Sequence, residues 1–116
     1  MSSITIYHNP RCSKSRQSLE LLREHGEEPK IIEYLKDAPT REELQTILAK
    51  LNLNPTDILR TGEQIFKEKF KSMQFSEEEW LEVMIEYPKL IERPIVVKGN
   101  RAVVGRPPER VLDILE

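Results

Sequence analysis

One short segment near the amino terminus, HNPRCSKSR, combines a nucleophile with several cations. Cys12 is the only cysteine of the chain, and Arg11, Lys14 and Arg16 surround it. The thiolate is the nucleophilic form of cysteine, and nearby positive charge lowers the pKa of a thiol. A lone cysteine is more often a small buried hydrophobic residue, but so polar a segment is a poor candidate for the core. We therefore expect Cys12 to be a reactive thiolate, and His8 would favour it further if protonated.

The elements on either side of this segment place Cys12 at the start of a helix. Residues 3–7 (SITIY) are β-branched and aromatic and predict a strand, which an Asn-Pro pair ends. The helix begins at Ser13 and has Gly26 as its stop signal. Residues 30–35 (KIIEYL) predict a second strand, parallel to the first because a right-handed helical crossover joins them. Unpaired N–H groups and the helix dipole then favour an anion at Cys12.

The rest of the chain consists of a helical middle and a β-β-α end. Residues 40–87 are mostly helical, and two of their helices begin with capping boxes, Thr40 with Glu43 and Ser76 with Glu79. The segments PIVV and AVV flank a turn-forming stretch and predict a hairpin. Two prolines, Pro107 and Pro108, then begin a last helix.

This order of elements predicts an α/β thioredoxin-like sandwich with a mainly helical insert between the β-α-β and β-β-α halves. The length of 116 residues suits one domain, so we expect a single domain over residues 1–116. Its thioredoxin-like core would comprise about residues 1–36 and 92–116, and the helical insert about residues 38–90.

Composition excludes several classes of function. The net charge of -2 gives no overall attraction to nucleic acid or to an anionic membrane. The first residues show no cationic segment followed by an apolar run, and no run of 18 apolar residues occurs, so we expect neither export nor a membrane span. A single cysteine fits a reducing compartment, so we expect a cytoplasmic protein. The spacing of histidines and carboxylates predicts no metal site, and no tightly bound cofactor is expected.

Three arginines stand beside turns or prolines: Arg60 in ILRTGE, Arg93 in ERPIVV and Arg106 in VGRPPE. Each alone would be interpreted as a solvated surface charge. In a thioredoxin-like layout, however, the turn before Pro94 packs against the turn that carries Cys12. The segment with Arg106 follows the neighbouring strand of the hairpin, at an edge of the same sheet. Guanidinium groups donate paired hydrogen bonds, which suit a tetrahedral oxyanion.

Together these segments make the chain similar to a known family. IYHNPRCSKSR, EYL with PTREEL, ILR, ERPIVV, and GRPPE with VLDIL resemble the ArsC family of glutaredoxin-dependent arsenate reductases, and within it the YfgD-like branch. The resemblance covers essentially the whole chain. It implies Cys12 as the nucleophile, Arg60, Arg93 and Arg106 as oxyanion-binding residues, His8 and Ser15 as supports of the thiolate, and Pro94 as a cis-proline.

The resemblance also implies a mechanism. Cys12 attacks the arsenic of arsenate, glutathione adds to the covalent adduct as a co-substrate, and glutaredoxin completes the reduction to arsenite. The lone cysteine agrees with this, because relatives that use thioredoxin carry additional resolving cysteines. Arg11 stands where reductases with established activity commonly have a small residue, which leaves a different anion open as the substrate.

Two alternatives remain. Spx-type regulators share the fold and bind RNA polymerase, but their redox switch needs a CxxC, and Ser15 stands at the second cysteine position. A glutathione-dependent thiol oxidoreductase would use Cys12 on a substrate other than arsenate.

Overall fold

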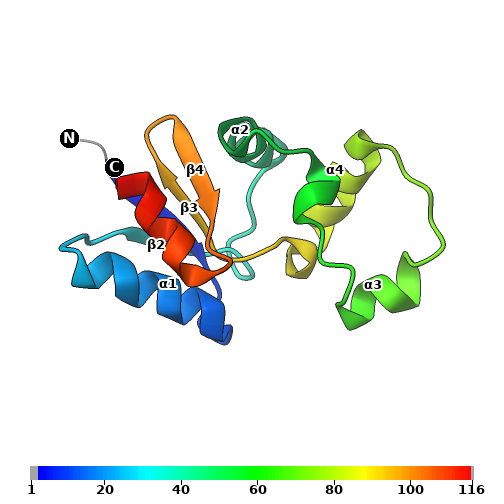
Figure 1. Cartoon of the computed structure of the whole chain (residues 1–116). Coiled ribbons are helices and arrows are strands. Elements are labelled where there is room, and N and C mark those ends of the chain that lie inside the picture. Colours follow the sequence, from blue (N-terminus) through cyan, green and yellow to red (C-terminus); the bar gives the residue numbers. More distant parts are fainter. Residues whose placement is uncertain (1–2, 116) are drawn as a thin grey trace. The chain divides into compact units, whose positions relative to one another are not determined.

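The computed structural model describes residues 3–115 and divides the chain into two compact units (Figure 1). One unit comprises the residues up to Asp37 and those from Arg93 onward; the other is Ala38–Glu92. The boundaries lie close to those expected for the core and the insert. That the two units act as a single domain stays a prediction.

The first unit is built on a four-stranded sheet. Its strands are β1 (Ile4–His8), β2 (Lys30–Glu33), β3 (Ile95–Lys98) and β4 (Arg101–Val104), in the order β2-β1-β3-β4. β1 pairs with β2 in parallel, as predicted, and β3 is antiparallel to both β1 and β4. The predicted hairpin is confirmed, and Gly99 takes the positive φ of 61° that its two-residue turn requires.

Two helices, α1 (Ser13–Glu24) and η3 (Pro108–Leu115), cover one face of this sheet. They lie side by side, coloured blue and red in Figure 1. The core between them and the sheet is apolar and consists of Ile4, Ile6, Leu19, Leu22, Val96, Val111 and Ile114. Because α1 is held along this core, its N-terminus and Cys12 are fixed at the end of β1.

The second unit is helical. It contains α2 (Arg41–Leu51), η1 (Pro55–Ile58), α3 (Gln64–Lys69), α4 (Glu77–Glu86) and η2 (Pro88–Leu90). Both predicted capping boxes are present, at the N-termini of α2 and α4. Buried residues of α2 and α4 form its core together with Ile58, Leu90 and Ile91. Trp80 stacks on Phe66 with ring centroids 5.7 Å apart.

Two elements differ from the prediction. The expected second strand reached residue 35, but β2 ends at Glu33, because the N–H groups of Lys36 and Asp37 turn back to donate to the Glu33 carbonyl. The last helix is present, but it is a 3-10 helix, tighter than an α-helix. Within residues 3–115, no helix has the length and apolar character that a membrane crossing requires.

Candidate functional site

Cys12 is the N-cap residue of α1. The turn from β1 is fixed by Asn9, whose carbonyl oxygen accepts from the Cys12 N–H at 3.0 Å and whose Oδ1 accepts from the Arg11 N–H at 3.0 Å. The Cys12 carbonyl then accepts the N–H of Arg16, which begins the helix. The Cys12 side chain makes no regular capping hydrogen bond, so the first N–H groups of α1 remain available to stabilise an anion at the sulfur.

The surroundings of Cys12 favour its thiolate. Burial raises the pKa of the thiol, whereas the backbone N–H of Ser15 and the guanidinium of Arg93 lower it, with a smaller contribution from the backbone N–H of Lys14. The net effect is a pKa below its ordinary value. Cys12 is a partly exposed residue. These are the features of a reactive cysteine.

Two of the predicted arginines meet at this sulfur. The Nη2 atom of Arg106 lies 3.6 Å from the Cys12 Sγ, and its Nε atom donates to the carbonyl oxygen of Arg93 at 2.9 Å. The Arg93 guanidinium also acts on this sulfur, since it lowers the pKa of the thiol. Cys12, Arg93 and Arg106, which are far apart in sequence, therefore form one cluster with a nucleophile and two forked cations.

A glycine that the sequence analysis missed holds this cluster together. Gly105 is buried, and its N–H donates to the Pro94 carbonyl at 2.9 Å. A Cβ at this position would lie 2.5 Å from the Oγ of Ser18 on α1 and 2.8 Å from Cγ of Pro94. The signal was present in the sequence, since a glycine directly after a strand often marks a close approach. The Arg93–Pro94 bond is cis, and so is the Arg106–Pro107 bond, which was not anticipated.

His8 and Ser15 form a buried network below the cysteine turn. The Ser15 Oγ lies 2.6 Å from the Nδ1 of His8 and accepts from the Asn9 N–H at 3.1 Å. Burial lowers the pKa of His8, the charge of Glu33 opposes this change, and Arg23 and Arg16 reinforce it. The His8 imidazole is thus kept neutral, so the idea that a charged His8 assists Cys12 is not supported.

The remaining predicted residues lie elsewhere. Arg11 is exposed, and the Nη1 of Arg16 donates to the Pro10 carbonyl at 2.9 Å. The side-chain cation that lowers the pKa of Cys12 is Arg93, whereas the sequence pointed to Arg11, Lys14 and Arg16.

Arg60 belongs to the unit Ala38–Glu92. Its Nε donates to Glu63 at 3.1 Å, and its Nη1 pairs with Glu92. Two carboxylates thus balance its charge, and its part in an oxyanion site stays a prediction.

No group of three or more histidine, cysteine or acidic side chains among residues 3–115 is arranged to hold a metal ion. The chemistry available to the described site is that of a thiolate beside guanidinium groups and a helix N-terminus, an arrangement that binds and attacks an anion.

Comparison with known proteins agrees with this site. Residues 7–114 match the ArsC family. The protein YfgD of Escherichia coli (strain K12) is 44% identical over 114 residues, which are 97% of this chain and 96% of that protein. The arsenate reductase of Haemophilus influenzae is 43% identical over 115 residues, 97% of this chain and 99% of that one.

Solved structures agree as well. An arsenate reductase from Vibrio cholerae superposes with a TM-score of 0.91 at 46% identity, covering 97% of this chain and 98% of that one. The fold is thus the thioredoxin-like fold predicted from the order of elements.

Proposed function

The chain belongs to the ArsC family, and we propose that it is an arsenate reductase that uses Cys12 as its nucleophile and glutathione and glutaredoxin as its reductants. The observation that carries this proposal is the cluster at the sulfur, where Arg106 lies 3.6 Å from a thiol whose pKa is lowered. Relatives named arsenate reductase at 40–43% identity support the choice of substrate.

The first step is attack of the Cys12 thiolate on the arsenic(V) of bound arsenate. A sulfur–arsenic bond forms, and one arsenate oxygen leaves as water after taking up protons. Arg93 and Arg106 bind the arsenate oxygens and stabilise the negative charge of the transition state, with Arg60 as a third oxyanion-binding residue. Ser15 and the neutral His8 fix the first turn of α1, so its N–H groups stay directed at the sulfur.

The second step needs a thiol from outside the chain. Reduction of arsenate to arsenite consumes two electrons, which two thiols supply when they are oxidised to a disulfide with release of one water. Cys12 is the only cysteine of this sequence, so it provides at most one of the two sulfurs. Glutathione adds to the arsenic adduct as the second thiol. Release of arsenite leaves a disulfide between Cys12 and glutathione, and glutaredoxin reduces this disulfide. We propose the cytoplasm as the setting because these thiols stay reduced there.

The test is an arsenate reduction assay with and without glutathione and glutaredoxin. We expect turnover only when the external thiol is present, and about one equivalent of reaction at most without it. Cys12→Ser should abolish turnover while circular dichroism shows a folded protein. Repeated turnover without added thiol would contradict the single-cysteine mechanism. Formation and removal of a glutathione adduct, with no reaction or protection by arsenate, would instead overturn arsenate as the substrate.

A further inference from the structure

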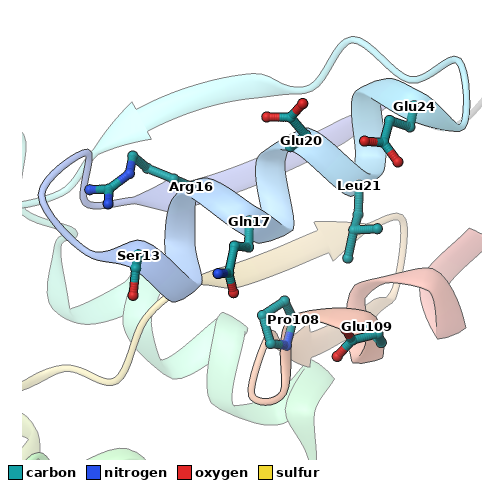
Figure 2. A pocket seen from close by; sticks show the side chains of 8 residues that line it. All are labelled: Ser13, Arg16, Gln17, Glu20, Leu21, Glu24, Pro108 and Glu109. Carbon is teal, nitrogen blue, oxygen red and sulfur yellow. The ribbon is translucent and has the colours of Figure 1, made fainter.

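A groove of about 600 Å³ runs along α1 where this helix meets the start of η3 (Figure 2). Ser13, Gln17 and Leu21 follow one another on one side of α1 and point toward Pro108 and Glu109 of η3. The volume is in the range of sites for small molecules. The groove lies outside the cluster formed by Cys12, Arg93 and Arg106.

One end of this groove is beside the nucleophile. Ser13 directly follows Cys12 in the sequence and lines the groove, and Glu24 at the last turn of α1 lines the other end. They are eleven positions apart on an α-helix, which corresponds to about 16 Å along the helix axis. A molecule joined through sulfur to Cys12 can therefore extend along α1 and remain in contact with the protein.

The charge of the groove changes along its length. Arg16, at the end nearest Cys12, is its one lining cation, and its Nη1 atom donates to the Pro10 carbonyl. Three carboxylates, those of Glu20, Glu24 and Glu109, line the part farther from Cys12. All three are exposed residues, and their carboxylates attract positive charge at this end.

We infer that this groove binds the non-reacting part of the external thiol, and that it favours a small thiol bearing an ammonium group remote from its sulfur. Glutathione, with the free amine of its γ-glutamyl residue, is a member of this class. The inference rests on the proposed function, which requires such a thiol. It adds where the thiol lies and which of its groups the protein recognises.

Thiol–disulfide exchange tests this inference without arsenate. The Cys12 thiolate attacks one sulfur of a symmetric disulfide, a bond to Cys12 forms, the original S–S bond breaks, and the other half leaves as a thiolate. Cys12 is oxidised and the leaving sulfur is reduced. The probes are three symmetric disulfides with six-carbon chains, which end in an ammonium group, a neutral hydroxyl group or an anionic carboxylate; their equal chain length keeps the leaving thiols similar. The measurement is the second-order rate constant for loss of the Cys12 thiol.

The variant to compare with wild type is Glu24→Gln combined with Glu109→Gln. We expect its rate with the ammonium probe to fall about fivefold, its rate with the neutral probe to stay unchanged, and its rate with the anionic probe to rise. The difference in rate between wild type and the variant should become smaller in high salt, because the charges are exposed. In the arsenate assay, the KM for glutathione should rise while the KM for arsenate stays the same.

A matched control removes two exposed carboxylates outside the groove, by Glu28→Gln with Glu86→Gln. An unchanged rate with the ammonium probe in the variant, or the same effect on this probe in the control pair, would overturn the inference. A uniform loss with every probe would also overturn it, because the variant would then be altering the thiolate itself. If exchange follows the expected pattern but arsenate is never reduced, the groove assignment stands and the proposed substrate falls.

Discussion

The guanidinium of Arg106 joins the main chain of Arg93 to the sulfur of Cys12: its Nε donates to the Arg93 carbonyl at 2.9 Å, and its Nη2 lies 3.6 Å from Sγ. One planar side chain therefore fixes the loop before Pro94 and faces the nucleophile. A lysine has one ammonium group and cannot hold both positions at once.

Arg106→Ala should therefore lower kcat/KM for arsenate by about 10²-fold, as the loss of a preorganised donor commonly does. Arg106→Lys should recover only part of this loss, because the bond to the Arg93 carbonyl is not remade. Steady-state kinetics measure both effects, with Arg110→Ala, which changes an exposed arginine of η3, as the control. Wild-type kinetics in Arg106→Ala would mean that this side chain does not act on the substrate.

The close contact between Gly105 and Ser18 predicts a second outcome. Gly105→Ala should lower the free energy of unfolding by about 1–3 kcal/mol, because the new Cβ would lie 2.5 Å from the Ser18 Oγ. It should also lower kcat/KM, since Gly105 joins Pro94 to Arg106. Adding Ser18→Ala removes the nearest clashing atom and should recover part of both losses.

The control for this pair is Ser18→Ala alone. The Ser18 hydroxyl is buried and has no hydrogen-bond partner among residues 3–115, so its removal should leave stability unchanged or slightly higher. Denaturant unfolding measures all three variants. An unfolding free energy for Gly105→Ala equal to that of wild type would show that the loop adjusts without strain.

Local signals in the sequence predicted the features that depend on neighbouring residues. The capping boxes of α2 and α4 and the place of Cys12 at the start of α1 follow from residues within one turn of one another. Such patterns fix where a helix begins, so the direction of the Cys12 pKa shift could be anticipated. Local patterns alone could not predict that Arg93 and Arg106 lie close to Cys12. That prediction also needed the expected thioredoxin-like fold, which brings their segments to the turn that carries Cys12.

Features that depend on tertiary contacts could not be predicted. The neutrality of His8 results from burial, which no neighbour in the sequence indicates. The pairing of Arg60 with Glu92 joins residues 32 positions apart. The groove arises only when η3 packs against α1, because its carboxylates come from both segments.

Arg60 should be the weakest of the three predicted oxyanion-binding arginines, because it already pairs with the carboxylates of Glu63 and Glu92. Arg60→Ala should lower kcat/KM by about tenfold or less, well below the effect of Arg106→Ala, because Glu63 and Glu92 already balance its charge. Glu92→Gln should tighten binding of arsenate, measured as protection of Cys12 from alkylation. An equal loss in Arg60→Ala and Arg106→Ala would contradict this ranking.

Protonation of His8 should destabilise the fold in mild acid. The pKa of His8 is lowered from 6.5, so the unfolded chain binds a proton at a pH where the folded protein does not. The stability that this residue contributes is present above pH 6.5 and is lost as the pH falls through the folded pKa. A proton on Nδ1 would also prevent Ser15 from donating its hydroxyl there. Unfolding experiments between pH 7 and pH 4 should show a smaller loss in His8→Gln than in wild type.

The lowered pKa of Cys12 should appear both in its reactivity and in the stability of the protein. Alkylation by iodoacetamide reports the thiolate fraction, so its rate should rise with pH around an inflection below that of a free cysteine. The inflection should move upward in Arg93→Ala, which removes a guanidinium that lowers the pKa, and should stay in place in Arg11→Ala, whose side chain is exposed.

The same shift should appear in the stability of the protein. Because the pKa of Cys12 is lower in the folded protein than in the unfolded chain, the unfolded chain binds more protons between the two values, and the free energy of unfolding rises with pH across that window. This contribution is lost as the pH falls through the folded pKa, and Cys12→Ser should lack it. An inflection at the value of a free cysteine, together with equal pH dependence of stability in wild type and Cys12→Ser, would mean that the first turn of α1 and the Arg93 guanidinium do not stabilise the thiolate.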